Sequence, residues 1–519
     1  MVDSRLTAGL SRRLAAGLKI SLAAGAAGLL LVLAGCTPSD ADPQPNPSPS
    51  TPTAPPLTVL STDAIRVADP AAITDPGSVV LSLNVFQRLM TAEPGQALLK
   101  PDAAKDCLFT ADTVYTCTLN PNLTFHNGHE LTSSDVKFSI QRALRLDVPG
   151  SSAPLLSTLR RIETPDALTV RFVLSRVDTQ FGWALASPSA SIVDEQIYNS
   201  DEVRPRDQPV VGSGPFSVTS FDQGVLRLQR NATYVGRTPP RMDSVLYSTV
   251  ADSAALEDAI KTGAADVVWR GLSAAAITRY SRQVTISEDD TTDAGYGMQV
   301  QTGTRVLMLA WSAKSPHRPD GDLRNAIAVA LQGDRTLDSV VPGGVPDHIS
   351  AFPLGGSAEP DVTWSNRIQL TLGYDPTMPN GQDIASQIRT RLEDTGGMSV
   401  RLRAVDPTAD SDPPDLMVLD RKAWTSTPLA WLQPYLDAPL PASAEDVDQL
   451  ERQYRGAGIG EESEATRAMA SLQRKAGADL VLVPQTQSDE YVFTAPGVEV
   501  PANSFGPGWQ LGFWGMFRA

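Results

Sequence analysis

From residue 57 onward, segments whose apolar residues have the spacing of a strand alternate with segments whose apolar residues have the spacing of a helix. Val136, Ile140 and Leu144 lie four residues apart behind Thr132 and Asp135, which is the pattern of a capped amphipathic helix. Apolar runs rich in β-branched residues predict strands at 57–60, 245–250, 264–269, 306–311, 368–374, 398–405, 415–420 and 478–484. Helical spacing predicts helices at 256–263, 323–331, 384–392 and 463–475. Strands that alternate with helices favour an α/β fold.

The first 35 residues have the pattern of a lipoprotein signal peptide. Basic residues up to Lys19 precede an apolar run over 20–33, which is shorter than the ~20 residues that span a bilayer. The run ends in Leu33-Ala34-Gly35-Cys36, which resembles the bacterial lipobox, where the cysteine becomes the lipidated N-terminus. An ordinary membrane anchor with an incidental cysteine is the alternative. The export route stays open, because Arg12-Arg13 also resembles a twin-arginine signal.

Residues 36–56 are interpreted as a lipid-bearing Cys36 followed by a disordered tether. Eight prolines lie among Ser, Thr, Asp and Asn over 37–56. This composition cannot bury enough apolar surface to fold, and it forms an extended, semi-rigid spacer. We therefore expect a folded body that is held by a lipid at the cell membrane, on its extracytoplasmic side.

The charge and the cysteines narrow the functions that the chain can have. A formal charge of −16 repels phosphate backbones, so we expect no nucleic-acid partner.

Cys107 and Cys117 flank a plausible turn at Ala111-Asp112. In an exported chain they are predicted to form a disulfide across a hairpin, and two buried thiols are the alternative.

The chain lacks the motifs of common enzymes. It contains neither GxSxG nor a Walker A sequence, and the glycines of 212–215 are too few for a phosphate cradle. His126, His129 and Glu130 straddle an Asn-Gly turn instead of lying four apart on one helix face, which argues against a metal site. We expect no enzymatic activity, no cofactor and no metal ion.

Four blocks in a fixed order resemble the family 5 extracellular solute-binding proteins, the oligopeptide- and dipeptide-binding lipoproteins of ABC importers. The blocks are Phe125–Gly128 with Leu131–Val136, Gly212–Phe216 with Arg230-Asn231 and Tyr234, the unit of Gly263 and Asp266, and Leu323–Ala326 with Asp334-Arg335. Together they cover most of 57–519, and the lipobox agrees with them independently.

The resemblance implies a two-lobed, periplasmic-binding-protein-like α/β fold with a hinge between the lobes. We expect lobe one over 57–303, with an extra subdomain, then lobe two over 304–479, and a return to lobe one over 480–519. Such proteins enclose a peptide or peptide-like ligand between the lobes and deliver it to the permease subunits of an ABC transporter. The chain is expected to act as a monomer.

One stretch departs from the family pattern, at the position of the acidic residue that pairs with a peptide's α-ammonium. Aligning Pro428 and Trp431 with the family motif puts Trp424 at that position, and Asp420 lies four residues earlier. A buried ammonium without a carboxylate partner would cost several kcal/mol. The sequence therefore predicts a ligand that is not anchored through a free α-amine.

Six residues are candidates for the ligand site, and each has a structural alternative. Asn84 and Phe86 lie on an early predicted helix, Ser213 in the glycine turn, Trp311 near the crossing to lobe two, and Asp420 and Trp424 in the divergent stretch. The alternatives are core packing for the aromatic residues, turn formation for Ser213, and a surface carboxylate for Asp420. A non-transport role, in sensing or in cell-envelope assembly, is the alternative function for the same scaffold.

Overall fold

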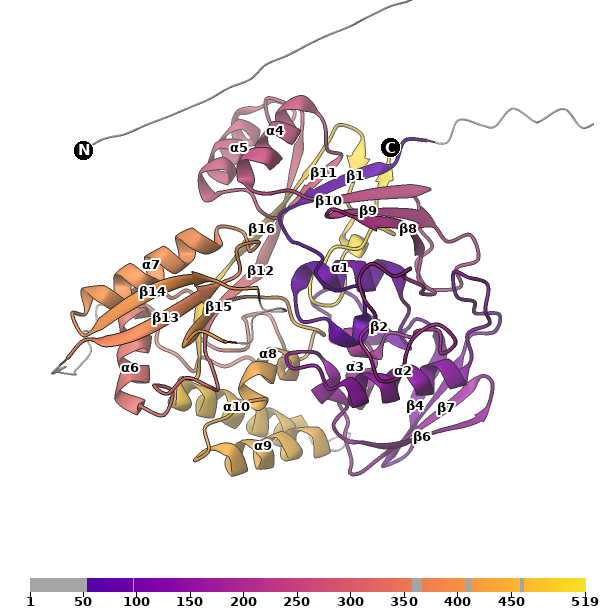
Figure 1. Cartoon of the computed structure of the whole chain (residues 1–519), viewed down its shortest axis with the longest axis horizontal. Coiled ribbons are helices and arrows are strands. Elements are labelled where there is room, and N and C mark those ends of the chain that lie inside the picture. Colours follow the sequence, from indigo (N-terminus) through magenta and orange to yellow (C-terminus); the bar gives the residue numbers. More distant parts are fainter. Residues whose placement is uncertain (1–53, 97, 357–365, 407–411, 458–461) are drawn as a thin grey trace, which may run out of the picture. The chain divides into compact units, whose positions relative to one another are not determined.

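The computed structural model describes residues 54–96, 98–356, 366–406, 412–457 and 462–519 (Figure 1). These residues belong to one compact unit, which begins at Ala54. The predicted signal peptide, Cys36 and most of the tether lie outside the described residues. Among the helices of the described ranges, none is long and apolar enough to cross a membrane.

A ten-stranded sheet runs through the unit. In spatial order its strands are β14 (Met398–Ala404), β13 (Ile368–Tyr374), β15 (Leu416–Arg421), β12 (Gly297–Trp311), β16 (Leu482–Thr494), β11 (Val267–Trp269), β1 (Leu57–Ser61), β10 (Ser244–Thr249), β9 (Val225–Arg230) and β8 (Phe216–Asp222). Strand β1 is parallel to β10 and β11, and β13 is parallel to β14 and β15. We call β11, β1, β10, β9 and β8 the first half of the sheet, and β14, β13 and β15 the second half.

The long strands β12 and β16 join these two halves and pair antiparallel along nearly their whole length (Figure 1). Their register shifts between Gln301 and Arg305 and again between Leu307 and Met308. Strand β12 begins well before the predicted 306–311. The predicted strand 478–484 is wrong at its start, because helix α10 continues to Asp479 and β16 begins at Leu482.

Helices connect the strands and cover the sheet (Figure 1). They are α1 (Pro76–Val85), α2 (Ser133–Leu146), α3 (Phe181–Ala184), α4 (Ser253–Thr262), α5 (Ala274–Ile286), α6 (Gly321–Ala330), α7 (Gly381–Asp394), α8 (Pro428–Leu436), α9 (Ala444–Gly456) and α10 (Glu462–Asp479). The predicted caps are confirmed at two of them. Thr132 and Asp135 form a capping box at the start of α2, and Gly263 ends α4 in the left-handed conformation with a φ of 68°.

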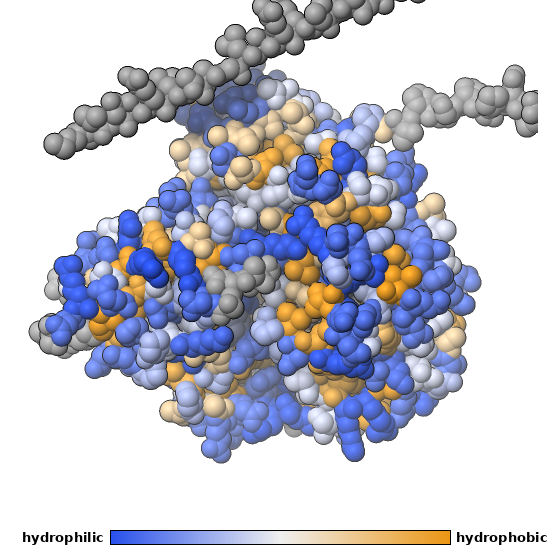
Figure 2. Space-filling model, viewed as in Figure 1, coloured by the Kyte–Doolittle hydropathy of each residue, from blue (hydrophilic) through white to orange (hydrophobic). Residues whose placement is uncertain are grey.

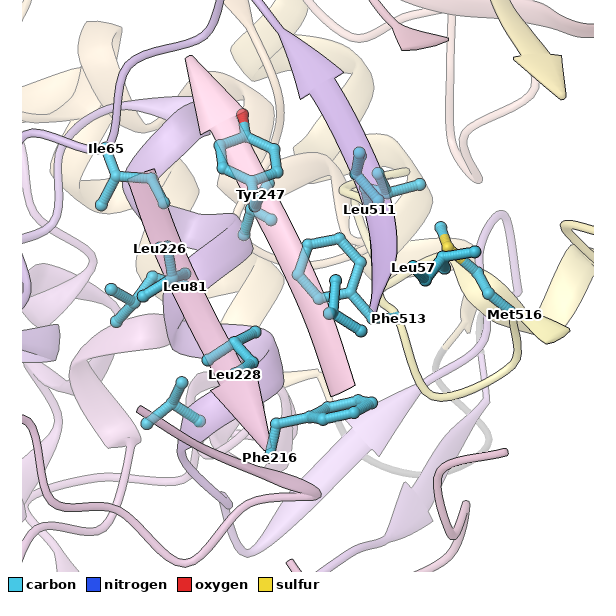
Figure 3. Packing of buried hydrophobic residues seen from close by; sticks show 14 of the residues in the cluster. Leu57, Ile65, Leu81, Phe216, Leu226, Leu228, Tyr247, Leu511, Phe513 and Met516 are labelled. Atoms are coloured by element: carbon cyan, nitrogen blue, oxygen red, sulfur yellow. The ribbon is translucent and has the colours of Figure 1, made fainter. Parts of the chain in front are cut away.

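The core beneath the first half of the sheet joins distant parts of the chain. Leu57 on β1, Tyr247 on β10 and Phe216 on β8 pack together with Phe513 and Met516, which lie near the C-terminus (Figure 3). Separate clusters of buried apolar residues lie around the second half of the sheet. The last residues of the chain therefore pack against the first strand.

A four-stranded sheet forms a separate subdomain that packs on α2 and α3. Its strands, in spatial order, are β4 (Ala104–Ala111), β5 (Val114–Leu119), β7 (Thr169–Leu174) and β6 (Leu159–Asp166). Cys107 faces Cys117 across the β4–β5 hairpin with 4.1 Å between their Cα atoms, and the predicted disulfide is confirmed. Two short pairs complete the strands, β2 (Met90–Ala92) with β3 (Leu99–Pro101) and β17 (Val498–Glu499) with β18 (Phe517–Arg518).

Candidate functional site

A cavity of about 470 Å³ lies between the two halves of the sheet, beside the crossing strands. Apolar and polar side chains line it in nearly equal numbers, whereas hydrophilic residues predominate on the molecular face seen in Figure 2. From the first half of the chain come Asp63, Ala64, Arg66, Thr74, Asp75, Pro76, Gly77, Pro149, Gly150 and Arg270. From later in the chain come Ala310, Trp311, Ser312, Asp375, Thr377, Met378, Val405, Pro413, Pro414, the run 417–422, Trp424, Gln433, Pro434 and Asp437.

Three of the six predicted ligand residues line this cavity. Trp311, at the end of β12, is 5% exposed, and its indole Nε1 finds no hydrogen-bond partner in the described part of the chain. Trp424, just after β15, is half-buried and packs against two apolar clusters. Asp420 is buried, which corrects the alternative that it is a surface carboxylate. The cavity therefore brings Trp311 from the crossing together with Asp420 and Trp424 from the divergent stretch.

The other three predicted residues do not line the cavity. Asn84 is fully buried on α1, where its amide donates to the carbonyl oxygens of Val80 and Leu511 at 2.7 and 3.2 Å. Its carbonyl oxygen accepts from the backbone N–H of Phe513 at 2.7 Å. Phe86 packs edge-on against Tyr198 in the core of the first half. Asn84 therefore fastens the C-terminal segment to α1.

Ser213 belongs to a turn that is fastened by His126. The backbone N–H of Gly212 donates to Nδ1 of His126 at 3.3 Å, so the imidazole proton sits on Nε2, which lies 3.1 Å from the carbonyl oxygen of Gly214. Burial lowers the pKa of His126 to about 4, which keeps the ring neutral. A Cβ on Gly212 would lie 2.1 Å from the carbonyl oxygen of Val85. The motif block that contains His126 and the block that contains Gly212 thus form one structural unit.

His129, the second histidine of the discounted metal motif, has protein partners. His129 Nδ1 lies 2.7 Å from the buried carboxylate of Asp194, which also accepts from the side chain of Asn127. Within the described ranges, no group of three or more His, Cys, Asp or Glu side chains is arranged to hold a metal ion.

A buried charge network fixes the crossing next to the cavity. Arg270, just after β11, is 3% exposed at its side chain and contacts three carboxylates. Its Nη2 lies 2.5 Å from Asp420 Oδ2, its Nη1 lies 3.2 Å from Asp63 Oδ2, and its Nε lies 3.1 Å from Glu490 Oε1. The contact to Glu490 is an ion pair without hydrogen-bond alignment. Since β11 and β15 lie in different halves of the sheet, the Arg270–Asp420 pair joins the halves.

Two further cations balance the network. Arg305 Nε lies 3.2 Å from Asp420 Oδ2, and Lys422 pairs with Glu490. Lys422 Nζ also donates to the carbonyl oxygen of Thr304 at 2.9 Å, inside the register shift of β12. Three carboxylates therefore meet three cations. Asp420 is held at Oδ2 by Arg270 and Arg305, and its buried Oδ1 has no hydrogen-bond partner among the described residues.

Burial and neighbouring charges act in opposite directions on the carboxylates of this network. Burial raises the pKa of Asp63 to about 6, although Arg270 opposes the shift. Burial also favours the neutral form of Glu490, but Lys422 and Arg270 outweigh it and lower the pKa of Glu490 to about 2. Glu490 is therefore charged at neutral pH. Asp63, with a pKa of about 6, changes its charge about one pH unit below neutrality.

Two more ion pairs join distant parts of the chain outside the network. Arg66, which follows β1, pairs with Asp375 after β13 at 2.5 Å and lines the cavity. Arg455, at the end of α9, contacts the buried Asp178 at 3.1 Å, and the backbone N–H of Thr179 donates to the carbonyl oxygen of Arg455 at 2.8 Å. The Arg66–Asp375 pair thus joins the two halves at the cavity wall.

Comparison with known proteins assigns the fold and the family. Residues 99–377 match the bacterial extracellular solute-binding proteins, family 5. The peptide transport periplasmic protein SapA of Salmonella typhimurium is 25% identical over 373 residues, which are 67% of this chain and 61% of SapA. The chain thus spans less than two thirds of that relative's length.

Solved structures agree with this assignment. AgaA from A. tumefaciens R10, in complex with agropinic acid, superposes with a TM-score of 0.76 at 19% identity, covering 90% of this chain and 99% of AgaA. AppA of Bacillus subtilis, in complex with a nonapeptide, gives a TM-score of 0.73 at 17% identity, covering 90% and 99%. The two-lobed binding-protein fold expected from the sequence is confirmed, and the chain belongs to the bacterial extracellular solute-binding proteins, family 5.

Proposed function

We propose that this protein is a lipid-anchored, extracytoplasmic binding protein of an ABC importer. It captures a peptide or peptide-like ligand between two lobes and delivers it to membrane permease subunits. In this proposal Cys36 carries the lipid, 37–56 is the tether, and the lobes comprise 57–303 with 480–519, and 304–479. The hinge is formed by the crossing strands β12 and β16.

The cavity between the halves carries the proposal. Arg66 and Arg270 line it from the first half of the sheet, and Trp311 and Trp424 line it from the crossing and the second half. A ligand that contacts both sides stabilises the arrangement in which the sides are close, which is how ligand binding favours closure. The volume of the cavity, about 470 Å³, suits a compact ligand.

The relatives support a peptide or peptide-like ligand, and their own ligands differ in size and chemistry. The printed name of SapA refers to peptide transport, and the related structures hold agropinic acid and a nonapeptide. We keep the prediction that the ligand is not anchored through a free α-amine. It is supported by Trp424 in the cavity wall and by the two cations that already neutralise Asp420.

Two measurements test the proposal. Native mass spectrometry of protein purified from its own host identifies any small molecule that copurifies. Calorimetry then compares one peptide with its N-acetylated form, and affinity is expected to change by less than about tenfold, or ~1.4 kcal/mol. Loss of binding on acetylation, reproduced by Asp420→Asn, would show that Asp420 anchors the amine after all.

The membrane anchor and the transport role are tested in cells. Cys36→Ser is expected to release the protein or leave it unprocessed, while a Ser39→Ala control in the tether stays at the membrane. Deleting the gene is expected to abolish uptake of the identified ligand. Unchanged uptake together with ligand binding in vitro would favour the sensory or envelope-assembly alternative.

A further inference from the structure

A buried ion pair joins helix α9 to the four-stranded subdomain outside the cavity. Arg455, at the end of α9, and Asp178, in the segment between β7 and α3, are 1% and 0% exposed. Nη1 of Arg455 lies 3.1 Å from Oδ2 of Asp178, and neither residue lines the cavity. In the proposed division of the chain, α9 belongs to lobe two and Asp178 to lobe one. The ion pair therefore connects the proposed lobes without being part of the cavity wall.

A backbone contact beside the ion pair completes the end of helix α9. The carbonyl of Arg455 is among the last four of the helix, which have no donor within the helix itself. The backbone N–H of Thr179 donates to this carbonyl at 2.8 Å, and the hydroxyl of Thr179 donates to it at 3.2 Å. A residue of the subdomain thus supplies the donor that the last turn of α9 lacks.

Each charged group is also held by its own part of the chain. Nε of Arg455 donates to Glu451, one turn earlier on α9, at 2.7 Å. Asp178 accepts from the hydroxyl of Thr158 at 2.7 Å and from the backbone N–H of Gln180 at 3.0 Å. The guanidinium and the carboxylate are therefore oriented from opposite sides. The contact between them can form or break while both groups keep their remaining partners.

Glu451 places the ion pair close to the cavity. Burial raises the pKa of Asp437, a residue of the cavity wall, and the charge of Glu451 adds to this shift. Burial opposes the charge of Arg455, but Asp178 and Glu451 outweigh burial and raise the pKa of Arg455. The guanidinium is therefore charged at neutral pH, and its surroundings lie within electrostatic range of the cavity.

We infer that Arg455 and Asp178 form a latch that holds the two lobes closed over the cavity before a ligand adds its own contacts. This inference rests on the proposed function and its two lobes. The crossing strands join the lobes covalently, whereas the latch joins them through contacts that can separate. The apparent affinity for a ligand depends on the fraction of molecules in the binding-competent form. The latch therefore strengthens ligand binding without touching the ligand.

The experiment measures the distance between two nitroxide labels by pulsed electron paramagnetic resonance. The labels are attached at Arg160→Cys on β6 and Gln449→Cys on α9, two exposed positions with one on each side of the latch. The full chain carries Cys36→Ser, and Cys107 and Cys117 are bonded to each other, so no other thiol reacts. Refolding from urea removes copurified small molecules, and the distance then reports on the protein alone.

Without a ligand, the labels are expected to give mainly one short distance. Arg455→Gln is expected to lower the ratio of closed to open molecules about tenfold or more, because closure then buries Asp178 without its cation. Asp178→Asn is expected to act in the same direction from the other side of the latch. The matched control is Arg452→Gln, which removes an exposed guanidinium that pairs with Asp448 of α9 itself. It is expected to leave the distances unchanged.

The outcomes separate the latch from the proposed function. Mainly long distances before any substitution at the latch, distances that Arg455→Gln leaves unchanged, or an equal change in Arg452→Gln each overturn the latch. Urea unfolding verifies that each variant is folded. Because no ligand enters the distance measurement, peptide binding with unchanged distances overturns the latch alone. Distances that shift as expected, in a protein that binds no small molecule, support the latch and overturn the proposed function.

Discussion

Asp420 and Arg421 are neighbours on β15, and they have opposite electrostatic surroundings. Asp420 lies between Arg270 and Arg305 in a network of three carboxylates and three cations. Arg421, on the other face of the strand, donates only to carbonyl oxygens. The balanced network holds the crossing together and leaves no charge over. Among the described residues, Arg421 has only these carbonyl partners, and the charge of Asp437 acts on it from beyond ion-pair distance.

The largest expected effect on stability comes from a substitution in the charge network of Arg270. Arg270→Ala leaves Asp63, Asp420 and Glu490 buried with too few cations, so the free energy of unfolding is expected to fall by about 3–5 kcal/mol. Urea denaturation measures the change. The exposed control Arg401→Ala is expected to stay within about 0.5 kcal/mol of wild type. A loss at position 270 no larger than in the control would contradict the structural role of the network.

The pH dependence of stability sharpens the comparison within the network. Because the folded-state pKa of Asp63 is raised to about 6, its contribution is full below an unfolded pKa of about 4 and is lost as pH rises through 6. His126, with a pKa of about 4, opposes this trend by favouring the folded state at higher pH. Asp63→Asn is therefore expected to remove about 1–3 kcal/mol of that pH dependence between pH 4 and 6, as measured by denaturation at several pH values. Parallel curves for the two proteins would refute the assignment.

Removing the unbalanced charge is expected to have a smaller effect on stability. Arg421→Met deletes a buried cation without leaving a carboxylate unpaired, so the free energy of unfolding is expected to change by no more than about 1 kcal/mol, in either direction. The carbonyl of Ala430 loses its donor, which limits any gain. A loss as large as that of Arg270→Ala would mean that Arg421 is a structural residue.

The smallest expected effect on stability comes from a substitution in helix α8, which holds Arg421. Pro434→Ala restores the N–H that the carbonyl of Ala430 lacks, so Arg421 loses its fixed partner while keeping its charge. Thermal unfolding is expected to occur at the same or a higher temperature. A lower unfolding temperature would show that the contact between Arg421 and Ala430 stabilises the fold more than the regular helical hydrogen bond does.

The sequence predicts the elements whose apolar patterns are uninterrupted. Strand β13 has the predicted bounds, and α2 and α4 begin or end at their predicted caps. Prediction fails where tertiary pairing decides the structure. The first part of β12 and the later part of β16 are largely polar, and they are strands because they pair with each other across the crossing. Helix α8 contains Pro434, which argues against a helix when it is considered locally.

The candidate site is predictable only in part, for the same reason. Trp311, Asp420 and Trp424 were identified from their local motifs, and all three line the cavity. Asn84 has every feature of a binding residue until its contacts with Leu511 and Phe513 are known, and those lie more than four hundred residues away. Arg421 was missed, although its proximity to Trp424 and the proline of the following helix were readable signals.

The interruption of the β12–β16 ladder has a mechanical consequence. A sheet that continues from β14 to β8 resists bending wherever its backbone hydrogen bonds are regular, and residues 302–304 are where that regularity fails. Gly303 takes a φ of 67° there, and side chains replace the missing ladder bonds: Thr304 Oγ1 donates to Glu490 at 2.6 Å, and Lys422 donates to the carbonyl oxygen of Thr304. In the proposed hinge, bending is therefore expected at these few residues, where side-chain contacts take the place of backbone ladder bonds.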